Sequence, residues 1–360
     1  MYDIKNKTVF ITGCCGTVGK ELIRQLLIIP EGQGPSKIIG YDNNENQLFF
    51  QDQEWLNETR VSFIMGDVRD LDSLQSKMCG VNIVFHCAAL KHVILCERSP
   101  EQALQTNVNG VQNIIAAANF NTVDKVIFTS SDKAVNPTNV MGTTKLMGER
   151  LMTAANSSRQ SNGPIFASTR FGNVLGSNGS VIPIFRNQII NGGPVTLTDR
   201  GMTRFVMSVS EAVELVLHSV SAAKGGEVFV AKMPVIQIED LAKAMIEEMS
   251  LKEIRIEEIG SKPGEKLYEE LMSEEETRRA LELDKFFSVL PAFRGIYSDI
   301  KYNYSNLISQ NVDDPYVSAL QKAMSLKEIK EYLNRNDLLH GLYDGNRTSR
   351  YWPGDKEEKI

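Results

Sequence analysis

The stretch TVFITGCCGTVGKELIRQLL, residues 8–27, decides the fold of this chain. It begins with a β-branched and apolar run, continues through Gly13, Gly16 and Gly19, and ends in a segment whose apolar residues recur at helical spacing. Glycines spaced G-x-x-G-x-x-G between a strand and a helix let the backbone turn tightly and offer helix-start N–H groups to a pyrophosphate. The stretch therefore predicts a strand–turn–helix unit that binds a dinucleotide, against the alternative of a glycine turn with a purely structural role.

Further apolar runs follow in the first half of the chain, separated by amphipathic segments such as the one that carries Val108, Val111 and Ile115. Short buried strands that alternate with helices are typical of a parallel sheet covered by helices. We therefore expect an α/β fold of the Rossmann type, with a doubly wound parallel sheet. The six expected strands span residues 8–11, 37–41, 62–65, 82–86, 125–130 and 165–171.

The character of the chain changes after Gly172, where Gly, Asn and Ser cluster in GNVLGSNGS and no further strand–helix–strand unit is clear. A chain of 360 residues, at roughly 150 residues per domain, is long enough for two domains. We expect the dinucleotide-binding domain over residues 1–172 and a smaller, mainly substrate-binding domain over residues 173–295, with an interleaved boundary. Residues 296–360 form an extension to which the sequence assigns no role.

The composition is that of an ordinary soluble globular protein, with 42% hydrophobic and 23% charged residues. Its 39 basic and 45 acidic residues give a formal net charge of −6, which lacks the broad positive field of a nucleic-acid-binding protein. The start of the chain has no basic segment leading into a long apolar stretch, and no apolar run approaches the ~18 residues of a membrane span. We therefore expect a cytoplasmic protein that acts on small molecules and has neither nucleic-acid nor membrane partners.

The five cysteines are odd in number and contain no C-x-x-C pair, which fits neither a disulfide framework nor a zinc site. The four histidines show no ligand spacing of the H-x-x-x-H kind. We expect reduced thiols and no metal site.

Asp42 follows the second expected strand, about 23 residues after Gly19, where a carboxylate can bind the ribose diol of a dinucleotide. The same charge repels the 2′-phosphate of NADP, and residues 43–47 supply no Lys or Arg to hold one. NAD is therefore the expected cofactor, with NADP less favoured. Asp67, after the third strand, could accept a bond from the adenine amino group or could instead cap the next helix.

Several motifs together resemble those of the extended short-chain dehydrogenase/reductases: TGCCGTVG, GDV, HCAAL, TNVNGVQN and the lysine at Lys145. Four longer stretches narrow the resemblance to the nucleotide-sugar 4,6-dehydratases of bacterial polysaccharide and surface-glycan biosynthesis, which typically act on UDP-N-acetylglucosamine. They are FTSSDKAVNPTNVMGTTKLMGERL, RFGNVLGSNGSVIPIFRNQI, MTRFVMSVSEAVELV and KPGEKLYEEL. The resemblance covers residues 8 to about 272, and residues beyond about 295 match only loosely.

The resemblance implies a catalytic set of Ser131, Asp132, Lys133 and Lys145, with Met141 in the place of the usual tyrosine. A thioether cannot take a proton from a sugar hydroxyl, so the usual base for hydride abstraction is missing. Methionine also occupies this place in a branch of the dehydratases, commonly in membrane-anchored long forms, and this chain resembles a soluble short form of that branch. The alternative is a relic that has lost catalysis.

The reaction that the resemblance implies oxidises the sugar at C4, eliminates water across C5 and C6, and returns the hydride to C6. Lys133 would be the C5 base, which requires a neutral amine and therefore a lowered pKa. Asp132 would have to be protonated to assist water loss, or would otherwise be a helix cap or salt-bridge carboxylate. Ser131 would bind the C4 oxygen and relay its proton, while Lys145 would bind the nicotinamide ribose and supply positive potential.

The remaining candidate residues fall into two groups. For the substrate we expect contacts from Lys91, His92, Asn173, the 176–180 turn with Ser180, Arg186 and Arg204, although either arginine could instead sit in a surface ion pair. For the cofactor we expect contacts from Gly13, Gly16, Thr17, Val18, Gly19, Asp42, Asp67, Val68, Ala88, Ala89 and Lys145.

The sequence thus favours a NAD-dependent nucleotide-sugar 4,6-dehydratase. One alternative is an epimerase or reductase of the same fold, which would need the NAD site but not the Asp132–Lys133 pair. A second alternative, suggested by Met141, is a protein that binds the cofactor without catalysis. The nucleotide base stays open between uracil, guanine and thymine, as do the stereochemistry at C5 and the number of subunits, although a homo-oligomer is usual in the family.

Overall fold

The first half of the chain supplies six parallel strands, and the computed structural model confirms all six that the sequence predicts, with bounds that differ by no more than one residue. The residues that the structure describes are 2–157, 163–177, 180–249, 253–260, 264–293, 297 and 299–339. The six strands are β1 (Thr8–Thr12), β2 (Lys37–Asp42), β3 (Val61–Met65), β4 (Ile83–His86), β5 (Lys125–Ser131) and β6 (Ile165–Phe171).

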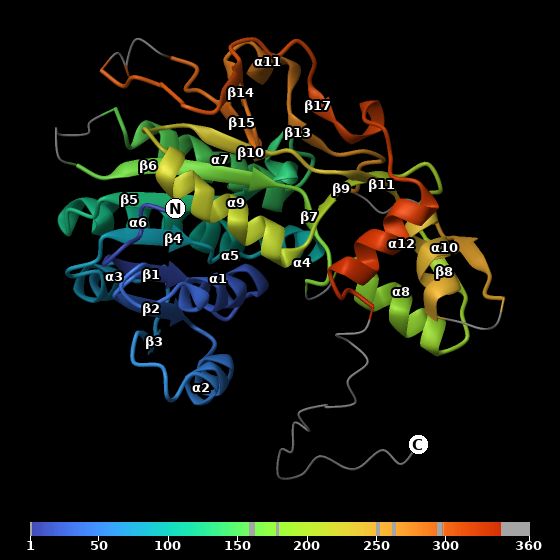
Figure 1. Cartoon of the computed structure of the whole chain (residues 1–360), viewed down its shortest axis with the longest axis horizontal. Helices are drawn as coiled ribbons and strands as arrows, with labels where there is room; N and C mark the ends of the chain where they lie inside the picture. Colours follow the sequence, from blue (N-terminus) through green and yellow to red (C-terminus); the bar gives the residue numbers. More distant parts are fainter. Residues whose placement is uncertain are drawn as a thin grey trace.

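Four strands from the second half extend the same sheet: β10 (Val228–Ala231), β14 (Ala280–Leu283), β15 (Phe286–Val289) and β16 (Leu307–Ser309). The resulting ten-stranded sheet has the order β16-β14-β15-β10-β6-β5-β4-β1-β2-β3. Figure 1 labels its strands except β16. From β10 to β3 every neighbouring pair is parallel, whereas β14, β15 and β16 pair in the antiparallel sense. The chain order reverses between β4 and β1, which is the switch point at which open α/β sheets bind ligands.

Alternate side chains of the strands face two different cores, as the period of two requires. In β1, Val9 and Ile11 belong to one core, and Phe10 belongs to the other. Helices α1 (Thr17–Ile28) and α9 (Val209–Ala222) contribute to the first core, and α3 (Leu71–Lys77), α6 (Gly110–Phe120) and α7 (Val140–Ala154) contribute to the second. Helices therefore cover both faces of the sheet, and the doubly wound α/β fold is confirmed.

A smaller lobe lies beside the carboxyl ends of the parallel strands (Figure 1). Its own core is formed mainly by α8 (Val181–Ile190), α10 (Ile238–Met249) and α12 (Leu326–Arg335). Its strands are β7 (Asn173–Val174), β8 (Val195–Leu197), β9 (Thr203–Met207), β11 (Val235–Gln237) and β12 (Ile256–Glu258). Because β10 and α9 return to the main sheet, the second half of the chain contributes to both parts, and the division at residue 172 remains a prediction.

The expected extension is partly built into the fold. Strand β17 (Tyr316–Val317) pairs with β13 (Glu270–Met272), and α12 belongs to the core of the smaller lobe. The extension beyond residue 339 lies outside the described residues. The remaining elements are α2 (Glu45–Glu54), α4 (Val93–Arg98), α5 (Pro100–Leu104), a π-helical turn (Gln105–Asn109), a 3-10 turn (Asp132–Ala134), α11 (Glu274–Thr277) and a 3-10 turn (Ser318–Leu320).

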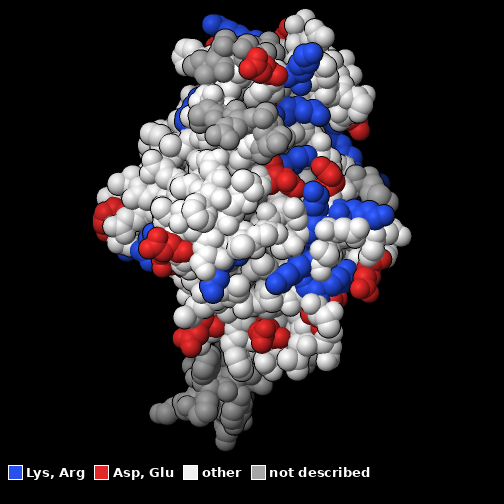
Figure 2. All heavy atoms as spheres, turned by 90° about the vertical axis from the view of Figure 1, so that its left-hand side faces the viewer, with Lys and Arg blue, Asp and Glu red and all other residues white. Residues whose placement is uncertain are grey.

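The surface in Figure 2 carries basic and acidic side chains interspersed, without a broad area of one sign. This face therefore shows no extended basic field of the kind that binds nucleic acid. Among the described residues, no helix is both long enough and apolar enough to cross a membrane.

Candidate active site

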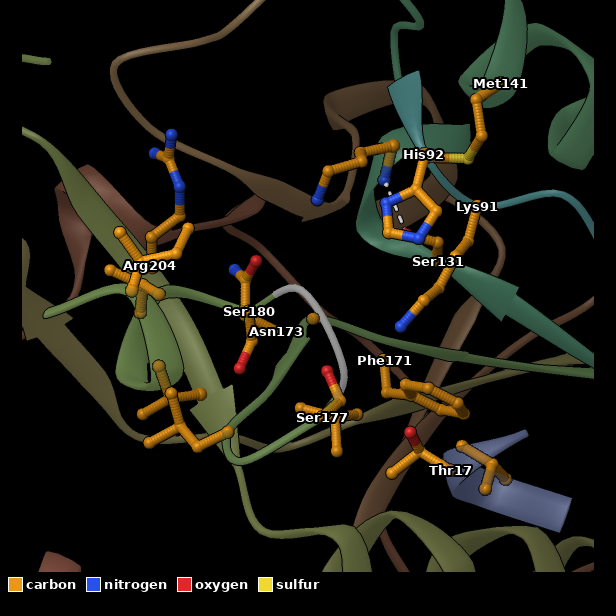
Figure 3. A pocket seen from close by; sticks show the side chains of 18 of the residues that line it. Thr17, Lys91, His92, Ser131, Met141, Phe171, Asn173, Ser177, Ser180 and Arg204 are labelled. Carbon is orange, nitrogen blue, oxygen red and sulfur yellow. Dashed lines mark hydrogen bonds between the residues drawn. The ribbon is translucent and has the colours of Figure 1, made fainter. Parts of the chain in front are cut away.

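A cavity of about 710 Å³ opens at the carboxyl ends of the parallel strands, between the main sheet and the smaller lobe. It is lined by the glycine-rich turn, the loop after β4, the end of β5, helix α7 and residues of the smaller lobe. Figure 3 shows Lys91, His92, Ser131 and Met141 gathered on one side, with Arg204 across the cavity from them. The volume is within the range of roughly 300–1,000 Å³ that small-molecule sites occupy.

The backbone of the glycine-rich turn packs closely against neighbouring backbone, at positions where a side chain would collide. Gly13 has a φ of +68°, and a Cβ added to it would lie 2.6 Å from the Ala88 nitrogen. A Cβ on Gly19 would lie 2.3 Å from the Gly13 oxygen, and Gly16 is the N-cap residue of α1. All three glycines line the cavity together with Thr17 and Val18, so the N-terminus of α1 faces it. The turn and helix start therefore fit the pyrophosphate of a dinucleotide.

The two acidic residues expected near the adenosine differ in their contacts. Asp42 ends β2, and its carboxylate accepts bonds from the backbone N–H of Cys15 (2.9 Å) and of Asn44 (3.0 Å). Asp67 accepts bonds from the Arg69 guanidinium, which lower its pKa, so its carboxylate is already paired. The helix that follows is capped by Asp70 instead, so the capping role considered for Asp67 is wrong.

Other cofactor candidates lie close by. Ala89 lines the cavity, and the Ala88 N–H donates to the Thr12 hydroxyl at 3.3 Å. Val68 is buried in the core of the sheet, and its carbonyl accepts a bond from Asn113.

Cys14, Cys15 and Asp42 have ligand atoms within 4.8 Å of one another. The Cys15 sulfur accepts a bond from Gln51, and all five cysteines are free thiols. These three residues lack the C-x-x-C and H-x-x-x-H spacings of common metal sites, and the expectation of no metal site remains a prediction.

Ser131, Asp132 and Lys133 form one hydrogen-bonded group at the end of β5. The Ser131 hydroxyl donates to Asp132 Oδ1 at 2.7 Å, and Lys133 Nζ donates to the same oxygen at 3.0 Å. Asp132 is almost completely buried, and its second oxygen, Oδ2, has no hydrogen-bond partner among the described residues. A buried carboxylate oxygen without a partner is costly, which is typical of a group that acts on a ligand.

Glu269 and Arg204 extend this group from the opposite side. Glu269 Oε1 lies 3.7 Å from Lys133 Nζ and 3.6 Å from Arg204 Nε. Arg204 also donates to the backbone carbonyls of Thr203 and Lys266, and its side chain is only 9% exposed. The alternative of a surface ion pair is therefore wrong for Arg204, because the arginine and Glu269 are both buried; its second carboxylate partner, Glu265 at 3.8 Å, is partly exposed.

The expected lowering of the Lys133 pKa is wrong for this arrangement. Burial alone would lower the pKa of the ammonium, but the Asp132 and Glu269 carboxylates overcome this effect and raise it. Glu269 itself has a raised pKa because it is buried and because Asp132 carries a like charge nearby. The structure therefore places a protonated Lys133 between two carboxyl groups.

Lys145 and Met141 lie on α7, one helical turn apart. Lys145 Nζ donates to the Thr129 carbonyl at 2.9 Å and lies 4.6 Å from the centre of the Phe128 ring. Burial lowers its pKa to about 8. Met141 is buried beside Cys96 and lines the cavity, and none of the described lining residues is a tyrosine.

The candidates for substrate contact are only partly brought together. Lys91, His92, Asn173, Ser180 and Arg204 all line the cavity, and burial lowers the pKa of Lys91. The Ser180 hydroxyl is buried and unpaired within the described part of the chain. Arg186 is half-buried on α8 and is absent from the described lining, and residues 178–179 of the expected turn lie outside the described residues.

Sequence reasoning missed two residues that build the site. Asn107, in the π-helical turn, bonds both backbone groups of Leu90 and the Thr144 hydroxyl, and so fixes the loop that carries Lys91. An asparagine within an apolar helical pattern was the available signal. Glu269 lies in KPGEKLYEEL, a stretch recognised as a motif without a role for its acidic residues.

Residues 9–291 match the family model described as "Polysaccharide biosynthesis protein". The chain belongs to this family. Two relatives of this chain are an uncharacterised membrane protein of Methanocaldococcus jannaschii and a UDP-glucose 4-epimerase of Rickettsia rickettsii. The first is 48% identical to this chain, over 80% of this chain and 86% of its own length. The second is 40% identical, over 91% of this chain and 95% of its own length.

Solved structures share the fold. Pen from Bacillus thuringiensis is 40% identical, with a TM-score of 0.85 over 94% of this chain and 99% of its own. DesIV, a dTDP-glucose 4,6-dehydratase from Streptomyces venezuelae with NAD and TYD bound, is 20% identical, with a TM-score of 0.64 over 72% of this chain and 86% of its own. The second similarity concerns the fold alone.

Proposed function

We propose that the protein is a NAD-dependent nucleotide-sugar 4,6-dehydratase, acting on UDP-N-acetylglucosamine or on a related GDP- or dTDP-sugar. The observation that carries the proposal is the group formed by Ser131, Asp132 and Lys133 beside the cavity. Elimination of water needs an acid and a base on one side of the sugar, and here a carboxyl and an amine share a 3.0 Å hydrogen bond. We further propose a cytoplasmic homo-oligomer.

The glycine turn, Asp42 and Lys145 are the residues that would hold NAD. Gly13 and Gly19 leave room where a Cβ would collide, and Asp42 stands where a ribose diol would meet a carboxylate. When bound, NAD would supply the acceptor for the C4 hydride and the hydride that is returned to C6. Lys145, held against the Thr129 carbonyl, supplies fixed positive charge that favours a developing alkoxide.

Ser131 would take the place of the missing phenol as the first acceptor of the C4 hydroxyl proton. Its own proton already points to Asp132 Oδ1, 2.7 Å away, so a relay through Ser131 would leave Asp132 protonated. Protonated Asp132 can then donate to the departing C6 hydroxyl, which leaves as water. The proton lost at C4 thus ends in the water, and the carboxylate is restored.

Lys133 would remove the C5 proton and give it back when the hydride returns to C6. It can do so only as a neutral amine, so it must first lose the proton that Asp132 and Glu269 stabilise. The product is a 4-keto-6-deoxy sugar nucleotide.

An epimerase is the second candidate, because Rickettsia relatives that are about 40% identical carry the name UDP-glucose 4-epimerase. That reaction removes and returns a hydride at C4 and needs a base for the C4 hydroxyl but no acid–base pair at C5 and C6. The third candidate is a protein that binds the cofactor without catalysis. The observation that supports it is Met141, which stands in the place of the usual tyrosine base.

One experiment separates the three. The purified protein is incubated with NAD and each candidate sugar nucleotide, and the products are analysed by mass spectrometry. A 4,6-dehydratase yields a product lighter by one water, without net NADH. An isomer of unchanged mass would identify an epimerase, and no conversion of any sugar nucleotide would favour the binding protein.

A further inference from the structure

We propose that Glu269 is a positioning residue that acts through Lys133: its carboxylate holds the ammonium in place and opposes the loss of the proton that Lys133 must give up to become a base. The inference deepens the proposed dehydratase and rests on it. Glu269 lies 136 residues further along the chain than Lys133, immediately before β13, yet its carboxylate faces the ammonium from across the site.

The geometry places the Glu269 carboxylate against two cations, Lys133 and Arg204. Its side chain is 5% exposed, and Oε1 lies 3.7 Å from Lys133 Nζ and 3.6 Å from Arg204 Nε. Lys133 Nζ is also bonded to Asp132 at 3.0 Å, so the ammonium has one carboxyl group on either side. Removal of either carboxylate should therefore leave the ammonium less stable.

The backbone of Glu269 is anchored independently of its side chain. Its N–H donates to the Ser318 hydroxyl at 2.9 Å, and its carbonyl accepts from the Ser318 N–H at 2.9 Å. The Ser318 hydroxyl also bonds the Thr203 hydroxyl at 2.8 Å, next to Arg204. Residues after the expected second domain thus place this carboxyl group in the site.

The charges around the pair stabilise the Lys133 ammonium. Asp132, Glu269 and Arg204 face Lys133, and Asp132, Lys133, Arg204 and Lys266 face Glu269. Burial and the Asp132 charge raise the Glu269 pKa, whereas Lys133 and Arg204 favour its ionised form. When Glu269 is protonated, the Arg204 charge is no longer offset and disfavours the ammonium.

The protons taken up and released by Lys133 balance over one turnover. Lys133 releases one proton to solvent before turnover, and the neutral amine takes the C5 proton of the sugar. When the hydride returns to C6, Lys133 gives that proton back to C5 and is neutral again. The proton released to solvent takes no part in the cycle, so neither a second base nor a further cofactor is needed.

The test compares Glu269→Gln with Glu270→Gln. The two variants remove the same charge from neighbouring residues, but Glu270 contacts Asn136 and Lys266. Lys133 is labelled with acetic anhydride at a series of pH values, and its modification is followed by mass spectrometry of the peptide. Without the Glu269 carboxylate the ammonium is less stable, so Lys133 should react about tenfold faster or more near neutral pH, and Glu270→Gln should match wild type.

The pH dependence of water loss gives a second readout. Activity that needs a neutral Lys133 rises with pH, and in Glu269→Gln this rise should move to lower pH. Glu269→Asp, which keeps the charge, should label more like wild type and provides a second variant if glutamine impairs folding.

Equal labelling of Lys133 in wild type and Glu269→Gln, or equal changes in both glutamine variants, would overturn the inference. The labelling does not depend on turnover. If Glu269→Gln speeds labelling as expected but wild type removes water from no sugar nucleotide, the contact is as we infer and the proposed dehydratase is wrong.

Discussion

A buried charge cluster behind the site provides the sharpest test of the structure. Arg170, on β6, is completely enclosed and forms bonds with Glu149 of α7 and Glu276 of α11. It also donates to the Leu271 carbonyl at 2.8 Å, two residues after Glu269. The cluster thus joins the helix that carries Lys145 to the segment that carries Glu269.

Glu276→Gln should destabilise the protein by about 3 kcal/mol at pH 7. Burial opposes ionisation of Glu276, but Arg170 overcomes it and lowers the pKa to about 2. A depression from an ordinary glutamate value to about 2 corresponds to about 3 kcal/mol of stability. Breaking a buried ion pair typically costs about 3–5 kcal/mol, which agrees. Glutamine can still accept the bond that Glu276 takes from the Ser273 N–H, so the helix cap is kept.

The assay is urea unfolding followed by circular dichroism, with Glu275→Gln as the matched control. The Glu275 side chain is 61% exposed and pairs with Arg279, so its loss should cost little. The Glu276 contribution is present above about pH 5 and lost as the pH falls toward 2, because a depressed pKa stabilises only the ionised form. Equal stability of the two variants, or a Glu276→Gln deficit that does not shrink at low pH, would refute the reasoning.

Three further predictions concern the site. Asp42→Ala should weaken NAD binding and reduce discrimination against NADP, measured by titration; a wild type that prefers NADP would contradict this. Lys133→Ala and Asp132→Asn should each slow water loss by about a hundredfold or more while NAD binding is kept, and turnover in deuterated water should label C5; full activity would remove that residue from the mechanism. Met141→Leu should keep substantial activity, since such a swap costs less than about 1.5 kcal/mol of packing, whereas Ser131→Ala should be far more damaging; recovery of a dead wild type by Met141→Tyr alone would favour the relic.

The first six strands of the main sheet were predictable because a local sequence pattern marks each of them. Each is a short apolar run bounded by turn residues, and the glycine turn after β1 identifies the unit to which it belongs. Strand β10 was not recognised, because its four residues, VFVA, are too short to separate from other apolar pieces of the second half. Its parallel pairing with β6 depends on contacts between residues far apart in the chain, which a local sequence pattern cannot reveal.

The site was predictable where its residues are neighbours in the chain and not where they are distant. Ser131, Asp132 and Lys133 are consecutive, so their contact follows from one motif. The protonation of Lys133 does not, because it depends on Glu269, which is brought in by β13 and Ser318. Sequence alone suggests that a lysine in a closed site loses its proton, and the second carboxylate reverses that expectation.

Under the proposed function, the same geometry offers the C4 proton another route despite Met141. A tyrosine one helical turn before Lys145 would serve as the base for the C4 hydroxyl, and its loss leaves that proton without its usual acceptor. Here Ser131 reaches a buried carboxylate at 2.7 Å whose other oxygen is unpaired among the described residues, so a proton taken by Ser131 has a destination. In that reaction, Asp132 needs one proton to expel water, and oxidation at C4 releases one. A phenol would compete for that proton, whereas a thioether leaves the route from Ser131 to Asp132 open.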